Sequence, residues 1–470
     1  MGVGALMGLR RRLLPLLVPV AVATTLLAGT CVLETNASAT AALAGTSGSR
    51  TLAGSVPATN GEWPGVGKIC EPGAGGASSV RGVGPKTIGI AVFNDESNTV
   101  LPGLEREFVQ FADAFAAWCN ASGGINGRHI VIDSRDAALF NSAQVTNEAC
   151  QSDFMAVGGG MVFDAPTVPV RVSCGLGQIT GYTPSDAGSS AALQVNPSNT
   201  NPKYVTAGWF AALAKKYPEA VQKAALGAEN NPNVLEPEHK YEYAAEAQGW
   251  KVEDFQIIPL SVTDWTPYIQ DLQSKGIEAV WPSDAGTITS YVQAMATAGY
   301  DPAFLILGVQ FYAQSTIQAI AGLHLPPVYV ETSWWPFELA SQNPSTEQLV
   351  QVMHTYAKGD TVDFDDEEAA ESWLLWAKAA SDCGSDLTVS CVLDGAASQP
   401  NWSAGGIEAP VTHLTMSDEN PVPSPCFALL QATPHGFVYA KSITRPTQSI
   451  WNCNPKNVIE LTPQQIASLG

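Results

Sequence analysis

KTIGIAVFNDESNTVLPGLEREFVQFADAFAAWCNASGGINGR, residues 86–128, contains the pattern that decides the fold. Residues 86–93 form an apolar, β-branched run, which predicts a buried strand. After the polar residues 94–99, apolar side chains recur at steps of three and four, which predicts a helix with one buried face. This stripe consists of Leu101, Leu104, Phe108, Phe111, Phe115 and Trp118. Gly123 and Gly124 end the helix, so the segment reads as strand, loop, helix and turn.

The same alternation of strands and helices continues along the chain and restarts near residue 200. The expected strands are 128–133, 154–157, 178–181, 223–227, 251–259, 277–281, 303–307 and 327–330. The expected helices are 142–150, one that closes at 170–173, 201–217, 237–249, 265–274, 288–297 and 315–320. This alternation predicts right-handed βαβ connections and parallel sheets covered on both faces. The fold class is therefore α/β, with two doubly wound parallel-sheet lobes.

After residue 330 the pattern changes to helices followed by strands. Helices are expected at 347–356, 367–380 and 387–396, and strands at 409–414, 427–432 and 436–440. We expect the helices to return to the first lobe and the strands to the second, which requires about three hinge crossings. The predicted first lobe is 85–200 and 332–415, and the second is 201–331 and 416–440. Residues 441–470 are expected to be a tail pinned by a disulfide.

The charge balance excludes several classes of partner. The 470 residues include 44 Asp and Glu against 23 Lys and Arg, for a formal net charge of −21. Binding to nucleic acid requires basic residues, and so does binding to an anionic membrane through a polybasic patch. We therefore expect neither nucleic acid nor a charged membrane surface as a partner.

The N-terminus predicts export. Three arginines at 10–12 precede a short apolar run, and Ala37-Ser38-Ala39 matches a cleavage site, so residues 1–39 read as a signal peptide. A retained membrane anchor is one alternative. A second is a lipoprotein, because Ala28-Gly29-Thr30-Cys31 resembles a lipid-attachment site at Cys31. Residues 40–84, rich in Ala, Gly and Ser, are expected to be a flexible tether.

The cysteines fit an oxidising compartment. Of the nine, the eight beyond Cys31 suit four disulfides. Many pairings are open on sequence alone, and the expected topology favours one set. That set joins Cys70 to Cys119, Cys150 to Cys174, Cys383 to Cys391 and Cys426 to Cys453.

The segment Asn120–Arg128, Asn-Ala-Ser-Gly-Gly-Ile-Asn-Gly-Arg, ends a helix about thirty residues after an apolar first strand. It resembles the corresponding segment of leucine/isoleucine/valine-binding solute-binding proteins, which have the type I periplasmic-binding fold and deliver ligands to ABC importers. The resemblance covers about residues 86–440. It implies a small-molecule ligand, ABC permease subunits as partners, an extracellular or cell-envelope location, a monomer, and neither cofactor nor metal.

Ligands of open parallel sheets bind beyond the carboxyl ends of the strands, where the loops of two facing lobes form a cleft that closes by hinge motion. We expect the ligand there. The candidate ligand-binding residues are Asn94, Gly160, Met161, Phe163, Asp164, Thr180, Tyr182, Thr183, Asn230, Trp281, Ser283, Asp284 and Gln310. The resemblance implies that Thr180, Tyr182 and Thr183 could hold a ligand carboxylate.

Two differences from these relatives argue against an α-amino acid ligand. Met161, Phe163 and Asp164 stand in a loop where relatives usually offer serines. Gln310 stands where relatives often have an acidic partner for the ammonium group, and an amide cannot offset a buried ammonium charge as a carboxylate does. The acidic residues Asp95, Glu96, Asp164 and Asp284 could partly replace that acidic partner, although each is expected rather to be a solvated charge at the rim. Residues 365–368 are expected to be a charged helix start. The expected ligand is a polar or amphipathic small molecule of undetermined identity.

Two other functions are alternatives to delivery to an importer. One is a binding protein that passes a signal to a separate receptor. The other is a secreted enzyme, which we do not favour, because the sequence lacks G-x-S-x-G, H-E-x-x-H, G-x-x-x-x-G-K-[ST] and a G-x-G-x-x-G that opens a helix after a strand.

Overall fold

The computed structural model describes residues 60–198, 200–259, 262–282 and 288–469, all within one compact unit, 55–470. The expected signal peptide, the Cys31 anchor, the first part of the tether, and the candidates Ser283 and Asp284 lie outside the described residues. Among the described helices, none combines the length and apolar character needed to cross a membrane.

The first sheet has five parallel strands in the order β4-β3-β5-β6-β7. They are β3 (Thr87–Asn94), β4 (His129–Asp136), β5 (Met155–Val157), β6 (Gly177–Ile179) and β7 (Gln194–Val195). Its connecting helices are α1 (Arg106–Ala121), α2 (Ser142–Ser152), α3 (Thr167–Cys174) and α4 (Asp186–Ser189). This sheet and the helices on it form the first lobe.

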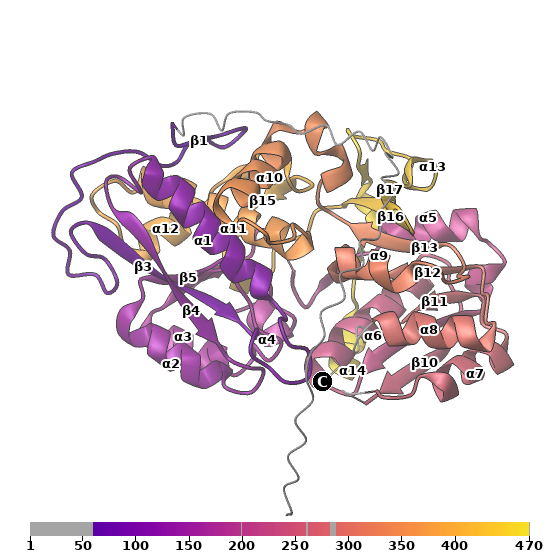
Figure 1. The fold of residues 1–470 in the computed structure, drawn as a ribbon. Helices are drawn as coiled ribbons and strands as arrows, with labels where there is room; N and C mark the ends of the chain where they lie inside the picture. The colour runs from indigo at the N-terminus through magenta and orange to yellow at the C-terminus, as the bar shows by residue number, and fades with distance from the viewer. Residues whose placement is uncertain (1–59, 199, 260–261, 283–287, 470) are drawn as a thin grey trace, which may run out of the picture. The chain divides into compact units, whose positions relative to one another are not determined.

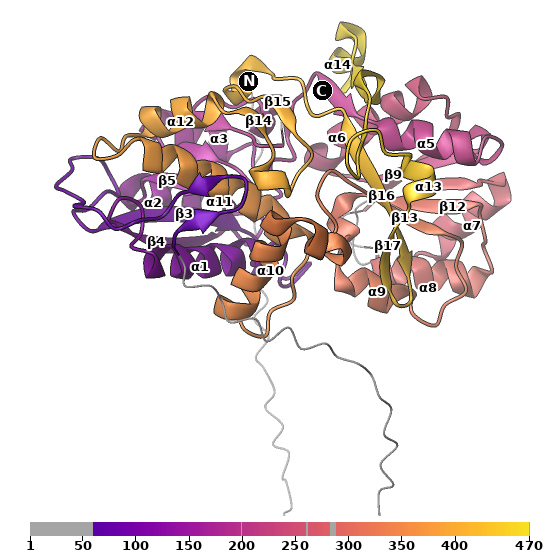
Figure 2. The same ribbon diagram turned by 90° about the horizontal axis from the view of Figure 1, so that it is seen from above.

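Three later helices pack on the first lobe, as expected from the sequence. They are α10 (Pro344–Tyr356), α11 (Phe364–Asp382) and α12 (Val389–Ala397). Trp373 of α11 is fully buried, and its ring lies 5.4 Å from that of Phe115 of α1. In Figures 1 and 2 these orange helices lie beside the indigo strands and α1, which are far from them in the sequence.

The second sheet has the order β10-β9-β11-β12-β13-β16-β17, with β18 paired to β16. Its strands are β9 (Ala224–Glu229), β10 (Val252–Ile258), β11 (Ala279–Trp281), β12 (Phe304–Leu307), β13 (Val328–Thr332), β16 (Cys426–Thr433), β17 (Gly436–Tyr439) and β18 (Asn452–Cys453). Its helices include α5 (Gly208–Lys216), α6 (Pro232–Ala247), α7 (Thr266–Lys275), α8 (Ile288–Ala298), α9 (Gln314–Ile320), α13 (Lys441–Thr444) and α14 (Pro463–Leu469). The strands up to β13 are parallel, whereas β16 and β17 are antiparallel to their neighbours. We call this sheet and its helices the second lobe.

The chain passes between the two sheets three times: after β7, after β13 and before β16. This confirms the predicted α/β class with two doubly wound lobes and about three crossings. The closing strands expected at 427–432 and 436–440 add to the second sheet as β16 and β17, next to β13 in Figure 2.

Three two-stranded sheets lie outside the two large ones. They are β1 (Glu62–Trp63) with β2 (Gly67–Lys68), β14 (Pro400–Trp402) with β15 (Val411–His413), and β8 (Tyr204–Thr206) with β19 (Val458–Glu460). The strand expected at 409–414 therefore pairs locally and does not join the second sheet. The helix expected over 201–217 is wrong at 204–206, because the tail strand β19 gives this β-branched segment a pairing partner.

The first long helix begins later than its apolar stripe suggests. Glu105 has a left-handed backbone with φ 62°, so α1 starts at Arg106. Leu101 and Leu104 therefore precede the helix. Phe108, Phe111, Phe115 and Trp118 are the part of the stripe that α1 buries.

The flexible tether expected over 40–84 is wrong for residues 60–84. Trp63, Ile69 and Cys70 are fully buried, and Trp63 Nε1 donates to Ser345 Oγ at 2.7 Å. Backbone bonds hold the glycine-rich part as well, since the Gly75 amide donates to Asn126 O at 3.2 Å. The few apolar residues in this stretch pack on α1 and α10. Composition alone does not show that such a surface is available.

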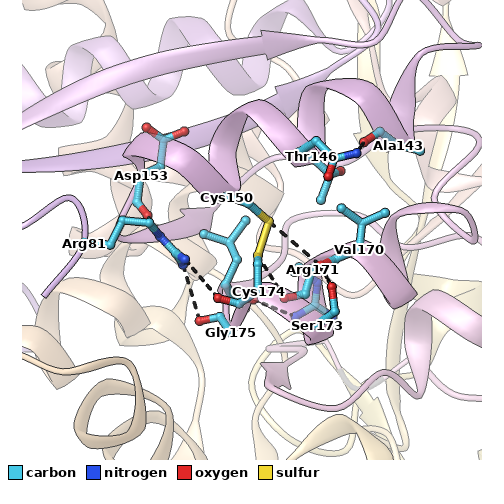
Figure 3. Close-up of a disulfide and its surroundings, with 12 residues drawn as sticks. Arg81, Ala143, Thr146, Cys150, Asp153, Val170, Arg171, Ser173, Cys174 and Gly175 are labelled. Atoms are coloured by element: carbon cyan, nitrogen blue, oxygen red, sulfur yellow. Dashed lines mark hydrogen bonds between the residues drawn. A yellow bond between two sulfur atoms is a disulfide. The ribbon is translucent and has the colours of Figure 1, made fainter.

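All four predicted disulfides are present: Cys70–Cys119, Cys150–Cys174, Cys383–Cys391 and Cys426–Cys453. The second of these joins the C-terminal parts of α2 and α3 (Figure 3). Beside it, the Arg81 guanidinium donates to Asp153 O at 2.8 Å and to Cys174 O at 2.9 Å. The N-terminal segment thus binds the same two helix ends that the disulfide joins.

We expect the double variant Cys150→Ala/Cys174→Ala to lose about 2–3 kcal/mol of unfolding free energy. The bridge spans 24 residues, and without it the unfolded chain gains the entropy of an open loop. Urea unfolding followed by circular dichroism measures the change. The control is Val172→Ala, an exposed position on the same helix, which should change stability by less than about 0.5 kcal/mol. Equal stability of the double variant and the wild type would contradict this expectation.

Candidate functional site

The loops at the carboxyl ends of the strands contact one another across the two lobes. Asn233, in the first turn of α6, donates through Nδ2 to Val162 O at 2.8 Å, and Val162 lies in the loop after β5. Lys240 of α6 forms an ion pair with Asp186 of α4. Lys240 is 8% exposed, so water screens this pair poorly. These two contacts join the lobes at the edge where ligands of such sheets bind.

Asp95 organises the first-lobe side of this edge. It follows β3 and is fully buried, and its carboxylate accepts the amides of Leu139 at 2.6 Å and Val162 at 2.8 Å. One side chain thus ties together the loops after β3, β4 and β5. The expectation that Asp95 is a solvated rim charge is wrong, because these backbone donors replace its water.

Six buried acidic residues gather at this edge. They are Glu105, Asp164, Glu331, Glu367, Glu368 and Glu371, which we call the acidic cluster. None is more than 8% exposed. Glu105 and Asp164 lie in the loops after β3 and β5, Glu331 lies on β13 of the second lobe, and the other three lie on α11.

Electrostatic interactions link the six residues in a connected series. The charges of Glu368 and Asp164 act on Glu105, those of Glu371 and Glu331 act on Glu368, and that of Glu371 acts on Glu367. Burial is the main cause that raises the pKa of Glu105, Glu367 and Glu368 well above the usual value, and the neighbouring carboxylates raise it further.

Asp164 is the member of the cluster that the sequence predicted. It is 5% exposed, and burial raises its pKa to about 7 although Ser185 donates to it. Gly188 packs against it so closely that a Cβ there would lie 1.8 Å from Asp164 Oδ2. The prediction that Asp164 is a solvated charge at the rim is therefore wrong as well. Glu96 is more exposed and forms an ion pair with Arg106 at 2.7 Å.

The acidic first turn of α11 also differs from the prediction. Asp365, Asp366 and Glu367 occupy its first turn, where the helix dipole favours negative charge, and Asp363 forms a capping box with Asp366. However, Asp366 and Glu367 are fully buried and do not form a solvated charge run. The helix buries side chains on all its faces, and Trp373 and Trp376 are among them.

Two other loops approach the cluster. The loop after β12 contains the 3-10 segment Val309–Phe311 and then Tyr312, whose hydroxyl donates to Glu338 at 2.6 Å. Burial raises the pKa of Tyr312, and the charge of Glu367 raises it further. In the loop after β6, Thr180 O accepts a hydrogen bond from Ser372 Oγ of α11 at 2.7 Å.

The structure places several predicted ligand residues in supporting positions. Asn94 is buried and donates to Val92 O and Ser134 Oγ. Thr180 Oγ1 donates to Tyr182 O at 2.8 Å, and Thr183 Oγ1 shares a hydrogen bond with Thr200. Gly160 packs against Tyr182, since a Cβ at Gly160 would lie 2.6 Å from that of Tyr182.

The remaining predicted residues lie in apolar cores, stack on another ring or are exposed. Met161 packs in a first-lobe core, and Trp281 packs in the second-lobe core beside Trp209. We interpret both as core residues rather than ligand contacts. Phe163 stacks on Phe140, and Asn230 and Gln310 are exposed.

Five members of the cluster were not predicted from the sequence as site residues: Glu105, Glu331, Glu367, Glu368 and Glu371. One signal was available for α11. Its acidic first turn is followed directly by Ala-Ala and then Trp-Leu-Leu-Trp at 373–376, which leaves the helix no wide polar face. The other two acids have no comparable signal, because only the fold brings residues 105 and 331 to this edge.

Among the residues that the structure describes, no group of three or more His, Cys, Asp or Glu side chains is arranged to hold a metal ion. The acidic cluster is therefore not arranged as a set of converging metal ligands.

The chain matches the family model described as periplasmic binding protein over residues 87–436. Among solved structures it is similar to a fatty acid ABC transporter substrate-binding protein from Thermomonospora curvata, with TM-score 0.62 and 14% identity, covering 82% of this chain and 97% of that one. It is also similar to a possible leucine/isoleucine/valine-binding protein from Rhodopirellula baltica, with TM-score 0.61 and 12% identity, covering 77% and 98%. A third is an R. palustris solute-binding protein in complex with benzoate, with TM-score 0.60 and 14% identity, covering 75% and 95%.

A search of the curated proteins found no match. The family model nevertheless spans most of the chain, and the solved structures share its two-lobed fold. These findings confirm the resemblance inferred from Asn120–Arg128, and the chain belongs to the periplasmic binding protein family.

Proposed function

We propose that this protein captures a small polar or amphipathic molecule between its two lobes outside the cytoplasm and delivers it to an ABC importer of the branched-chain amino-acid type. The observation that carries the proposal is that loops at the carboxyl ends of both sheets meet, with Asn233 bonded to Val162 and Lys240 paired with Asp186. A ligand bound among these loops would add contacts that only the closed form offers, so binding would shift the population toward closure.

The names of the similar structures support a small-molecule ligand without identifying it. They refer to a fatty acid transporter, a possible leucine/isoleucine/valine-binding protein and a benzoate complex. One fold thus serves ligands of different polarity, and the residues of this chain must decide its own ligand.

A screen of metabolites by thermal shift, followed by isothermal titration, tests the proposal. We expect at least one compound to bind with one-to-one stoichiometry and to raise the melting temperature, because a ligand at about 100 times its Kd stabilises the native state by about 2.7 kcal/mol. Leucine, isoleucine and valine are included. Micromolar binding of any of these three would contradict the expectation that α-amino acids are not the ligand.

Closure of the lobes around the ligand leads to a second prediction, which concerns ligand affinity. Lys240→Met removes the ion pair between the lobes, so the closed form becomes less populated and the apparent affinity for the compound found above falls about three- to tenfold. Titration calorimetry measures the change. The matched control is Lys275→Met, because Lys275 pairs with Asp254 and Asp271 inside the second lobe and should leave the affinity unchanged. Equal affinities in the two variants would contradict a role of the Lys240 pair in closure.

A further inference from the structure

We infer that the acidic cluster receives the ammonium or guanidinium group of an organic cation, so that the ligand of this protein carries net positive charge. This inference rests on the proposed function and adds the chemical class of the ligand. It is carried by buried carboxylates that have no partner in the structure.

Glu105 is the first such carboxylate. Its residue is 4% exposed, and neither carboxylate oxygen has a hydrogen-bond partner. The charged groups that act on it are all acidic: Asp95, Asp164, Asp365 and Glu368. Its left-handed backbone, φ 62°, is an unfavourable conformation for a residue with a side chain. The fold therefore holds this side chain in an unfavourable conformation and an unfavourable electrostatic environment.

Glu367 is the second buried carboxylate without a partner. It is fully buried, and neither of its carboxylate oxygens has a partner. The charges that act on it come from Glu338, Asp366, Glu371 and Asp363. Most buried polar groups in native proteins are hydrogen-bonded, so two carboxylates with four unpartnered oxygens at one edge require an explanation.

The basic residues of the described chain do not neutralise these two side chains. Glu105 and Glu367 take part in none of the ion pairs found among those residues. Arg171 acts on Asp164 electrostatically, but its guanidinium donates to Leu193 O at 2.9 Å and to Gln194 Oε1 at 2.8 Å. The described residues therefore supply no ion-pair partner for Glu105 or Glu367, and a bound cation would supply one as these carboxyl groups release their protons.

An organic cation fits better than a metal ion. Calcium requires six to eight oxygen ligands that converge on one point. No group of three or more acidic, His or Cys side chains in the described residues has such an arrangement. An ammonium or guanidinium group needs only one or two carboxylates at hydrogen-bond distance. An α-amino acid fits poorly, because its own carboxylate would face the other acids of the cluster.

The test is a titration of the whole purified protein at pH 7.5 with two sets of probes. The cations are putrescine, spermidine, agmatine and choline, and the comparison compounds are leucine, benzoate and octanoate. We expect at least one cation to bind at micromolar concentration. Glu105→Gln and Glu367→Gln should each weaken that binding at least about tenfold, since both remove a carboxyl group that can ionise against the cation and keep the side-chain volume.

The control variant is Glu246→Gln, an exposed position on α6 outside the cluster, which should bind as the wild type does. Circular dichroism checks that each variant folds. If Glu105→Gln does not fold, Glu367→Gln decides the result by itself, because Glu367 lies in the first turn of α11 and not at a left-handed position.

Three results would overturn the inference, and they are distinguishable from a failure of the proposed function. If leucine, benzoate or octanoate binds and no cation does, the solute-binding function stands and the cationic ligand is rejected. If a cation binds equally well to the wild type and to both Gln variants, its site is not the acidic cluster. If no compound of either set binds, the inference is rejected, and the metabolite screen described above decides separately on the proposed function.

Discussion

Trp63→Ala should destabilise the protein by about 3–5 kcal/mol, because it empties a fully buried aromatic site. The Trp63 ring lies 5.2 Å from that of Trp118 in an edge-to-face arrangement and 6.2 Å from that of Phe115. Its indole nitrogen donates to Ser345 on α10, so the substitution also leaves a buried hydroxyl without this partner. Urea unfolding monitored by tryptophan fluorescence and circular dichroism measures the loss.

The neighbouring residue provides the control for this prediction. Glu62 is exposed on the same short strand, and Glu62→Ala should change the unfolding free energy by less than about 0.5 kcal/mol. A loss below about 1 kcal/mol for Trp63→Ala would mean that the segment before residue 70 behaves as a tether after all. Such a result would contradict its place in the first-lobe core.

The ligand-free protein should become less stable as the pH rises from 5 to 8. Burial raises the pKa of Asp164 to about 7 in the folded state, whereas the unfolded chain titrates near 4. Between these two values the native state holds a proton that the unfolded state has released, so stability falls with rising pH. At about 1.4 kcal/mol per pH unit, Asp164 alone accounts for about 2–3 kcal/mol.

Other members of the acidic cluster add to this slope in the same direction. Burial raises the pKa of Glu371 to about 7 and raises those of Glu105, Glu367 and Glu368 well above the usual value. Urea unfolding of extensively dialysed protein at several pH values measures the slope. Asp164→Asn should reduce it, whereas Asp418→Asn at an exposed position should not. A stability independent of pH over this range would show that the cluster is solvated or already paired.

Much of the fold was predictable because its signals are local. The apolar run at 86–93 and the stripe from Phe108 to Trp118 each depend on residues close in sequence, and both formed as β3 and α1. The four disulfides were also predicted, since parallel topology places helix ends at shared edges of a sheet. Segment 204–206 was not predictable in this way, because its strand depends on pairing with residues 458–460 of the tail.

The candidate site was only partly predictable. The carboxyl-end rule selected Asp164, which belongs to the acidic cluster, but it also selected Met161 and Trp281, which lie in apolar cores. A strand-end position indicates which edge a residue occupies and does not indicate whether its side chain turns inward. For the same reason, Asp95 and residues 365–368 were wrongly predicted to be solvated charges.

The sequence by itself determined the fold class, the order of the elements and the family, because periodicity and the Asn120–Arg128 segment are properties of neighbouring residues. Only the tertiary structure decided that the protein has an acidic site. Glu105, Glu331 and Glu367 lie in separate segments of the chain, and neither Glu105 nor Glu331 is unusual in its own segment. Whether a carboxylate is a surface charge or an unpaired buried one depends on which segments exclude water from it, and that is settled only when the chain has packed.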